Sequence, residues 1–338
     1  MIIRKIIRIK ACNEEKNFKN QNKQIIETNF DEYVKIKTIN EEKDKMKKLN
    51  YILIGLLFVM SSSLFAQQES TFTFYKYHMN MINPAYAGMD NQTLGTSSIR
   101  TQWTGIVDAP KTQAVSFGTT LGHNLGFGVS VVNDRTFVEK QTFVGVDFSY
   151  KLQMSETIDL YLGLKAGGNF YSVNTSGLET YALQSDPALG SISTFNPNLG
   201  VGAVLKNNKF FVSLSIPRIL NTQNAKNENG YAMIATDRPH VYLSGGYDFD
   251  LNPSLVLKPS VLLRYVNGAP ASLDLNTMLQ IENNFEIGGT YRTDKAYAAM
   301  ANITLSKRFV FGFAYEMSTR PELASAKNTN EILLQFKF

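Results

Sequence analysis

The chain has 338 residues, enough for one large domain or two ordinary ones, and its apolar content of 43% excludes wholesale disorder. Its net charge of +5 comes from residues 1–66, which hold 13 basic and 8 acidic side chains, so the other 272 residues carry 21 of each. A neutral body lacks the basic surface that nucleic-acid binding requires. The single cysteine, Cys12, also lies in residues 1–66, which excludes disulfides, Cys-ligated metals and a thiol nucleophile from the body.

The first 45 residues are rich in Lys, Glu and Asn and have no apolar periodicity beyond their opening residues. A signal peptide normally begins a chain, and one follows this segment at residues 46–66. We therefore expect 1–45 to be a spurious or disordered N-terminal extension. The alternative is a cytoplasmic extension with a role of its own.

Residues 46–66 have the three parts of a secretory signal peptide. Lys47 and Lys48 precede ten apolar residues, 51–60, and a small-residue end at 61–66. Ten apolar residues are too short to cross ~30 Å of hydrocarbon as a helix. We expect Sec-type export and cleavage between Ala66 and Gln67.

Residues 94–338 repeat a two-residue alternation of apolar and small or polar side chains. At 308–317, for example, Phe311, Phe313 and Tyr315 share one face, and Gly312 and Ala314 share the other. Period two with one apolar face is typical of a β-strand. Fourteen such segments are predicted, at 94–103, 112–121, 125–133, 141–153, 157–171, 197–206, 208–216, 239–249, 254–266, 271–282, 284–292, 296–306, 308–317 and 329–338.

The predicted strands are long, and their connections alternate between short turns and two long polar loops, 172–196 and 217–238. Strands of soluble proteins average about five to six residues, whereas a tilted membrane-crossing strand needs about nine to eleven. This favours an all-β fold, a transmembrane antiparallel up-and-down barrel of about 14 strands spanning 94–338, over a soluble β-sandwich. The last strand closes with the outward aromatics Phe336 and Phe338, which resemble the signal read by the barrel assembly machinery.

The segment before the barrel, residues 67–93, is rich in aromatic residues and Met, and Pro84 interrupts it. It is interpreted either as a periplasmic or lumenal segment that packs the barrel interior, or as a gate or contact for export partners. Fourteen strands lie between the eight that side chains can fill and the sixteen to eighteen that leave a channel. A closed barrel of this size therefore needs an internal plug.

The sequence offers no constellation for catalysis or for a metal or other cofactor. His78, His123 and His240 are far apart and are interpreted as loop or strand-end residues. Glycines inside the predicted strands, such as Gly163 and Gly202, are expected to allow bends or close packing. We expect a protein that is not an enzyme.

A set of short motifs occurs in order along residues 70–338. Its members are Asn83, Pro84, Ala85, Tyr86, Gly88, Arg100, Gln102, Trp103, Pro110, Thr112, Asn133, Asp134, Arg238 and Pro239. With these motifs, residues 70–338 resemble the PorP/SprF family of outer-membrane proteins of the type IX secretion system of Bacteroidetes. One departure is the segment 133–141, where the family leads us to expect a Gly shortly after Asn-Asp.

The resemblance implies a non-enzymatic component of the bacterial outer membrane that assists export or surface attachment of a cognate secreted protein such as an adhesin. The implied partners are that protein, periplasmic components of the secretion system, the barrel assembly machinery and outer-membrane lipid. The alternative is a porin or transporter for small or hydrophobic solutes. Candidate partner contacts in the two long loops are Tyr181, Leu183, Tyr231 and Met233.

Overall fold

The computed structural model describes residues 71–175, 192–220, 222–223, 236–282, 284–320 and 328–338. These residues belong to one compact unit that spans 64–338. The expected extension at 1–45, the signal peptide at 46–66 and its cleavage site at Ala66 and Gln67 lie outside the described residues.

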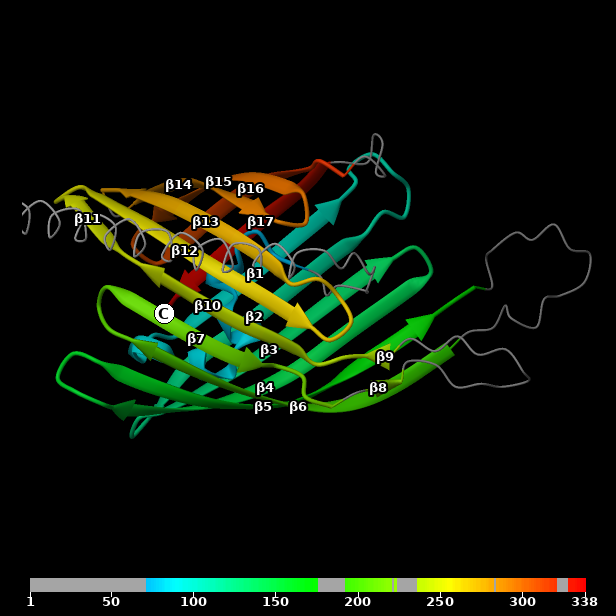
Figure 1. Ribbon diagram of the computed structural model, residues 1–338, viewed down its shortest axis with the longest axis horizontal. Coiled ribbons are helices and arrows are strands. Elements are labelled where there is room, and N and C mark those ends of the chain that lie inside the picture. Colours follow the sequence, from blue (N-terminus) through cyan, green and yellow to red (C-terminus); the bar gives the residue numbers. More distant parts are fainter. Residues whose placement is uncertain (1–70, 176–191, 221, 224–235, 283, 321–327) are drawn as a thin grey trace, which may run out of the picture. The chain divides into compact units, whose positions relative to one another are not determined.

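Fourteen antiparallel strands form a closed barrel (Figure 1). Each strand pairs with its neighbours in the chain, and the first and last strands close the cylinder, with Arg100 opposite Glu331. The strands are β1 (Leu94–Gln102), β2 (Lys111–Gly122), β3 (Leu125–Thr136), β4 (Glu139–Gln153), β5 (Asp159–Val173), β6 (Ile192–Lys206), β7 (Phe210–Ile216), β10 (His240–Tyr247), β12 (Leu255–Val266), β13 (Ser272–Ile281), β14 (Phe285–Arg292), β15 (Ala296–Leu305), β16 (Phe309–Ser318) and β17 (Asn328–Lys337).

Three further strands, β8, β9 and β11, are short and are not counted among the fourteen wall strands. β11 (Phe249–Asn252) continues β10 after a break at Asp248 and pairs with β12. β8 (Thr222–Gln223) and β9 (Thr236–Asp237) form a separate two-stranded ladder within the β7–β10 connection.

The all-β transmembrane barrel predicted from the sequence is confirmed, and each of the fourteen predicted segments corresponds to one wall strand. Two segments differ from the expected bounds. The eighth is divided between β10 and β11, and the sixth begins at Ile192 because its pairing with β5 continues past Pro197 to Val173.

The two faces of the strands have opposite chemistry. Large apolar side chains point away from the lumen, and Leu275, Phe311 and Leu334 are each 40–43% exposed. The alternate residues, such as Ser98 and Asn276, point inward and are buried. An apolar exterior with a polar interior is the arrangement of a barrel that faces lipid, and it confirms the alternation predicted from the sequence.

The two ends of the barrel differ in their connections. Turns of two to five residues join β2 to β3, β4 to β5, β6 to β7, β11 to β12, β13 to β14 and β15 to β16 at one end. The opposite end carries the longest connections, at 103–110, 174–191, 217–239 and 319–327. Outer-membrane barrels have short periplasmic turns and longer extracellular loops, so we name the two ends periplasmic and extracellular accordingly.

The turn between β3 and β4 contains only two residues, Phe137 and Val138. Phe137 has a φ of 52°, in the left-handed region that glycine adopts without strain. This is the turn in which the family resemblance leads us to expect a Gly. The chain keeps the turn with a bulky residue whose ring contacts Trp103, with ring centroids 6.5 Å apart.

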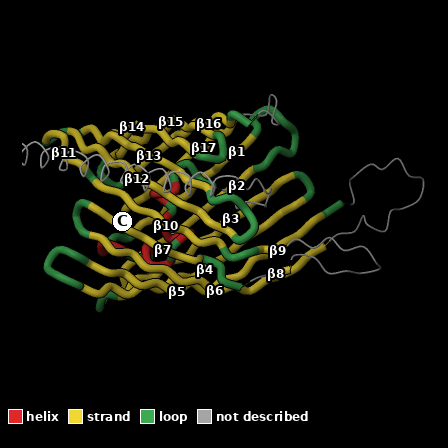
Figure 2. The backbone as a smooth tube through the Cα atoms, in the orientation of Figure 1, coloured by secondary structure: helices red, strands yellow, loops and turns green. Residues whose placement is uncertain are grey.

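The segment before the barrel lies inside it. It consists of four short helices, η1 (Tyr75–Tyr77), α2 (Met79–Ile82), η2 (Pro84–Tyr86) and η3 (Met89–Asn91), which Figure 2 shows within the ring of strands. We call residues 71–93 the plug. In the part of the chain that the structure describes, no helix is long and apolar enough to cross a membrane.

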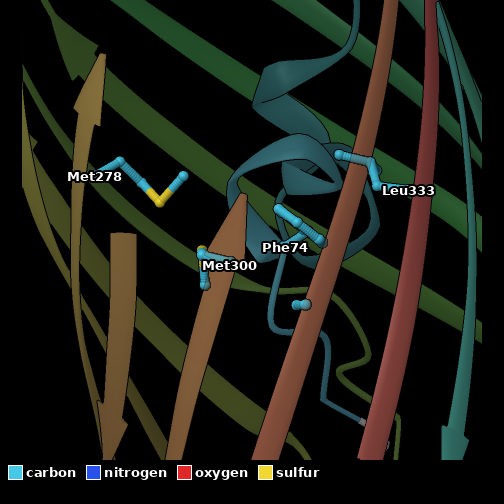
Figure 3. Packing of buried hydrophobic residues seen from close by; sticks show 5 residues of the cluster. Phe74, Met278, Met300 and Leu333 are labelled. Atoms are coloured by element: carbon cyan, nitrogen blue, oxygen red, sulfur yellow. The ribbon is translucent and has the colours of Figure 1, made fainter. Parts of the chain in front are cut away.

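Apolar clusters fix the plug to the wall. Phe74 packs against Met278, Met300, Ala314 and Leu333 from four strands, and all five side chains are buried (Figure 3). A second buried cluster joins plug residues to the neighbouring strands β10 and β12 and consists of Tyr75, Met79, Tyr242 and Leu262. Burying an apolar side chain of this size stabilises by about 1.5–3 kcal/mol.

Replacing Leu275 with Arg is expected to cost about 2–4 kcal/mol of folding free energy in lipid vesicles, because the residue lies midway along β13 on the lipid face. Tyr297→Arg, near the extracellular end of β15, is the control for depth and should cost about 0–1 kcal/mol. Urea titration of the barrel in vesicles measures both free energies. Equal costs would contradict the membrane placement.

Inward positions do not serve as neutral controls for that experiment. A side chain at Gly312 would lie 3.0 Å from the ring of Phe74, and Asn276 is buried with a hydrogen bond to Thr290. Because the lumen is filled at these positions, Arg is expected to be destabilising there as well.

Candidate functional site

The segment Asn83 to Gly88, which the family pattern singled out, forms the helix η2 of the plug and the residues on either side of it. Asn83 caps η2: its Oδ1 accepts a hydrogen bond from the N–H of Ala85 at 2.9 Å, and Pro84 occupies the first helical position. The side-chain amide of Asn83 also donates to the Ser213 Oγ at 2.9 Å. One residue therefore sets both the shape of the plug and its attachment to β7.

The wall has a glycine, Gly163, at a point where the plug backbone approaches it closely. A Cβ on Gly163 would lie 2.2 Å from the nitrogen of Ala85 and 2.4 Å from the carbonyl carbon of Pro84. Ala85 itself is fully buried. The glycine on β5 was expected to allow a bend or close packing, and close packing against the plug is what it allows.

Gly88 ends this part of the plug in a conformation that favours glycine. Its φ is 62°, and a Cβ would lie 2.2 Å from the carbonyl oxygen of Thr119. Its own carbonyl accepts a hydrogen bond from the Thr120 hydroxyl at 2.9 Å. The conformation and the contact with β2 both require the absence of a side chain.

Polar side chains hold the plug around most of the wall. Eleven of the fourteen strands contribute a hydrogen bond or an ion pair to it. The wall–plug pairs are Ser98–His78, Thr120–Gly88, Ser149–Ala87, Lys165–Asn80, Lys206–Asp90, Ser213–Asn83, Ser260–Tyr75, Glu286–Tyr77, Asn302–Tyr77, Glu316–Thr73 and Glu331–Thr73.

Six buried charges of alternating sign, from six strands, form a chain of ion pairs near the extracellular end of the lumen. We call them the lumenal ion-pair chain. Each residue bonds to the next, with N–O distances of 2.6–3.5 Å. The members, in the order in which they are paired, are Arg264, Asp274, Arg292, Glu316, Arg100 and Glu331.

The last members of this chain bind the start of the plug. The carboxylate of Glu331 accepts hydrogen bonds from the backbone N–H groups of Thr73 at 2.7 Å and Phe74 at 3.1 Å. The Thr73 hydroxyl accepts a hydrogen bond from Arg100 at 3.0 Å and donates one to Glu316 at 3.2 Å. The plug thus begins near the extracellular ends of β1, β16 and β17 and passes along the lumen to the periplasmic end, where β1 starts.

A second buried ion pair supports the middle of the plug. The ammonium of Lys165 lies 2.8 Å from the Asp147 carboxylate, and both side chains are at most 1% exposed. The same ammonium donates to the carbonyl oxygen of Asn80 at 3.0 Å and to the Ser130 hydroxyl at 3.3 Å. A buried charge needs such partners, and here one of them belongs to the plug.

His78 lies in the connection between η1 and α2, in keeping with its interpretation as a loop residue, and its side chain is buried in the plug. Its Nε2 lies 2.7 Å from the hydroxyl of Ser98, and its ring lies 5.2 Å from that of Phe72. Burial lowers the pKa of His78 to about 3, so the imidazole is neutral at physiological pH.

The remaining residues that match the family pattern lie on the wall and at its extracellular rim. Thr112 donates to Asp134 at 2.6 Å, and Asn133 accepts from Thr142 at 3.0 Å, on β2, β3 and β4. At the rim are Gln102, whose N–H donates to Pro110, Trp103, which contacts Phe137, and Arg238, which precedes Pro239 and donates to the Asn267 carbonyl.

The expected assembly signal lies at the periplasmic end, with both rings on the outer face. Phe336 is 39% exposed and Phe338 is 72% exposed, and their ring centroids are 4.8 Å apart. The expected partner contacts Tyr181, Leu183, Tyr231 and Met233 lie outside the described residues.

Sequence reasoning missed most of the lumenal ion-pair chain. Arg100 was singled out by the family pattern, whereas its partners Glu316 and Glu331 were not. Their signal was present, because a charge at an inward position of a membrane strand needs an opposite charge nearby. The partners could not be named without the register of strands far apart in the sequence.

One protein family and several solved structures are similar to this chain. The family model described as "Type IX secretion system membrane protein PorP/SprF" matches residues 64–336. Among solved structures, the Acinetobacter baumannii outer membrane protein Omp33 is similar at 10% identity and a TM-score of 0.44, over 74% of this chain and 100% of that one.

The CymD monoaromatic hydrocarbon channel is similar at 12% identity and a TM-score of 0.44, over 77% of this chain and 91% of that one. The NanC porin is similar at 8% identity and a TM-score of 0.40, over 73% of this chain and 100% of that one. No curated protein matches the sequence. The family model covers nearly the whole of the compact unit that contains the plug and the barrel, and the chain therefore belongs to the PorP/SprF family of type IX secretion system membrane proteins of the bacterial outer membrane.

Proposed function

We propose that this barrel acts without enzymatic chemistry and assists the export or surface attachment of one cognate secreted protein, such as an adhesin. Membership of the PorP/SprF family supports a role in type IX secretion. In the part of the chain that the structure describes, no group of three or more His, Cys, Asp or Glu side chains is placed to hold a metal ion.

The plug is the observation that carries this proposal. Residues 71–93 occupy the lumen and bond to most of the wall strands, so the barrel has little open path for a solute. The charges of the lumenal ion-pair chain are also paired with one another. Arg292, for example, binds both Asp274 and Glu316, which leaves few free charges of the kind that would attract ions into a pore. This weakens the rival interpretation as a porin or transporter.

A plugged barrel offers a protein partner only its two ends. The extracellular end carries the two long loops, 174–191 and 217–239, in which the sequence mixes aromatic and aliphatic side chains with Asn, Ser and Thr. Such mixtures are common at adaptable binding surfaces. We propose that these loops hold the exported protein, with Tyr181, Leu183, Tyr231 and Met233 as candidate contacts. Periplasmic components of the secretion system, the barrel assembly machinery and outer-membrane lipid are the other proposed partners, after Sec-type export.

The test replaces residues 224–235 with a short Gly/Ser linker, which retains the ladder between β8 and β9. The barrel should still migrate in a heat-modifiable way on gels, because the pairing of the wall strands is unchanged. The cognate protein should disappear from the cell surface, as measured by labelling of intact cells.

The control exchanges residues 321–327, a connection at the same end, for a Gly/Ser linker of equal length. Surface display should survive that exchange. If display also persists after both long loops are shortened, the loops do not hold the partner and this proposal is wrong.

A further inference from the structure

A cavity of about 290 Å³ lies at the periplasmic end, between the plug and the wall. Its lining combines apolar side chains, among them Met79, Met89 and Phe211, with charged side chains, which are Lys76, Asp90, Lys206, Lys209 and Asp248. It also includes the turn between β6 and β7, residues 207–209, so it adjoins the short-turn end of the barrel. Thr96 and Ser116, which line it from the wall, are buried inward-facing residues, so the cavity faces the lumen and not the lipid.

Lys76 has no polar partner in the part of the chain that the structure describes. Its ammonium lies 5.8 Å from the ring centroid of Phe211. Three other lysines at this end are each bonded to a carboxylate, and the pairs are Lys206–Asp90, Lys209–Asp250 and Lys258–Glu286. One lysine in a charge-paired region is thus left unpaired, at the edge of a cavity.

The electrostatics of Lys76 favour an incoming anion. Burial lowers the pKa of its ammonium, and the Asp248 carboxylate partly offsets that effect. The two groups are not bonded to each other, since no ion pair joins them within 4.0 Å. The cavity therefore presents a cation and an anion as separate, unbonded partners for a ligand.

We propose that this cavity binds a carboxylate-bearing segment of a polypeptide from the periplasm, either a chain end or an acidic side chain beside an apolar residue. The carboxylate bonds to Lys76, a peptide N–H donates to Asp248, and the apolar side chain packs against Phe211 and Met79. The site goes beyond the proposed function, because it lies at the end opposite the loops that hold the exported protein.

Size and charge select this class of ligand. Pockets for drug-sized molecules range from about 300 to 1,000 Å³, so a cavity of about 290 Å³ takes one or two residues rather than a folded surface. Of the three lysines that line the cavity, Lys206 and Lys209 are already paired with carboxylates, which leaves the ammonium of Lys76. One available ammonium near Asp248 suits a singly charged carboxylate better than a phosphate dianion, which Asp248 would repel more strongly. Membrane lipid is disfavoured because the cavity faces the lumen.

The experiment uses the purified full barrel in detergent micelles and two fluorescent dipeptide probes, acetyl-Leu-Phe with a free carboxylate and the same peptide with a C-terminal amide. The free acid should bind about tenfold or more tightly than the amide, since a charge-assisted hydrogen bond is lost with the carboxylate. Lys76→Met, which keeps the aliphatic stem, should abolish that difference. Lys307→Met, an exposed lysine in the β15–β16 turn at the same end, is the matched control and should preserve it.

Heat-modifiable migration verifies that each variant is folded before binding is measured. Inorganic phosphate and octanoate are added as competitors, and neither should displace the acid probe at concentrations where unlabelled acetyl-Leu-Phe does. Equal binding of acid and amide, or unchanged binding by folded Lys76→Met, would overturn the site. If phosphate or octanoate displaces the acid probe as strongly as unlabelled acetyl-Leu-Phe does, the ligand is not a polypeptide carboxylate. Because the assay contains no secreted protein, its outcome is independent of the surface-display test.

Discussion

Barrels carrying Gly163→Ala are expected to admit small solutes that the natural barrel excludes. The new Cβ would lie 2.2 Å from the backbone nitrogen of Ala85, so either the wall or the plug must move. The wall position is fixed by ladders to Ser149 on β4 and Gly202 on β6. The short helix η2 has no such ladder, and we therefore expect the plug to shift.

The effect on permeability is expected to be large. Each loss of about 1.4 kcal/mol in plug binding raises the unplugged population about tenfold. Fourteen strands without a plug enclose a lumen that lies between the filled and channel-forming sizes. Liposome swelling in a pentose solution measures the flux.

Gly95→Ala is the matched control for this substitution. Gly95 lies on β1, and a Cβ there would meet only the ring of Phe338 at an ordinary 3.6 Å. The control should leave flux at the natural level. If neither variant admits solute, with the plug of each still protected from protease, that result would show that the close approach at Gly163 is not required to keep the plug in place.

Replacing Glu316 with Gln is expected to cost about 3–5 kcal/mol of folding free energy, because it removes one partner from a buried pair. Glu316 binds Arg292 at 3.1 Å and Arg100 at 2.6 Å, and its carboxylate also accepts the hydroxyl of Thr73. Two buried guanidinium groups then lose their shared anion, and the start of the plug loses a contact. Urea titration in vesicles measures the loss.

Asp108→Asn provides the comparison at an exposed pair. Asp108 lies 3.6 Å from Arg135, and both side chains are more than half exposed. An exposed ion pair contributes about 0–1 kcal/mol, so this variant should be near neutral. Similar costs for the two substitutions would show that the lumenal ion-pair chain does not stabilise the barrel.

The sequence predicted the wall of this protein well, because each wall strand and each turn has a recognisable local sequence pattern. Alternation at Phe311 to Tyr315 needs only a period of two, and short turns with Asn and Gly reveal where strands end. The same alternation predicted which side of each strand faces lipid. The order of strands followed because neighbouring strands in the chain pair with one another.

The plug was predicted only as an element that a closed barrel of this size requires. Its contacts join residues 71–93 to positions as far away as Glu331, and no local pattern encodes them. Gly163 could be read as a strand glycine, but nothing in the sequence indicated that Ala85 would lie against it. The family pattern had singled out residues 83–88 and Arg100, and the structure shows what they do. Residues 83–88 form part of the plug, and Arg100 binds the start of the plug at Thr73.

The most direct test of the account asks whether the plug lies in the lumen of the protein in cells. A Cβ on Gly128 would lie 3.0 Å from the Cβ of Ala87, so the two must separate by about 0.8 Å to reach the ~3.8 Å typical of disulfides. Residues 67–338 contain no natural cysteine, so the pair Ala87→Cys/Gly128→Cys can bond only to each other or to an external thiol. Mass spectrometry of unreduced digests from outer membranes should find the linked peptide for this pair and not for Ala87→Cys/Gly95→Cys. Free thiols at both positions of a folded Ala87→Cys/Gly128→Cys barrel, reactive toward a water-soluble maleimide, would contradict the plugged lumen.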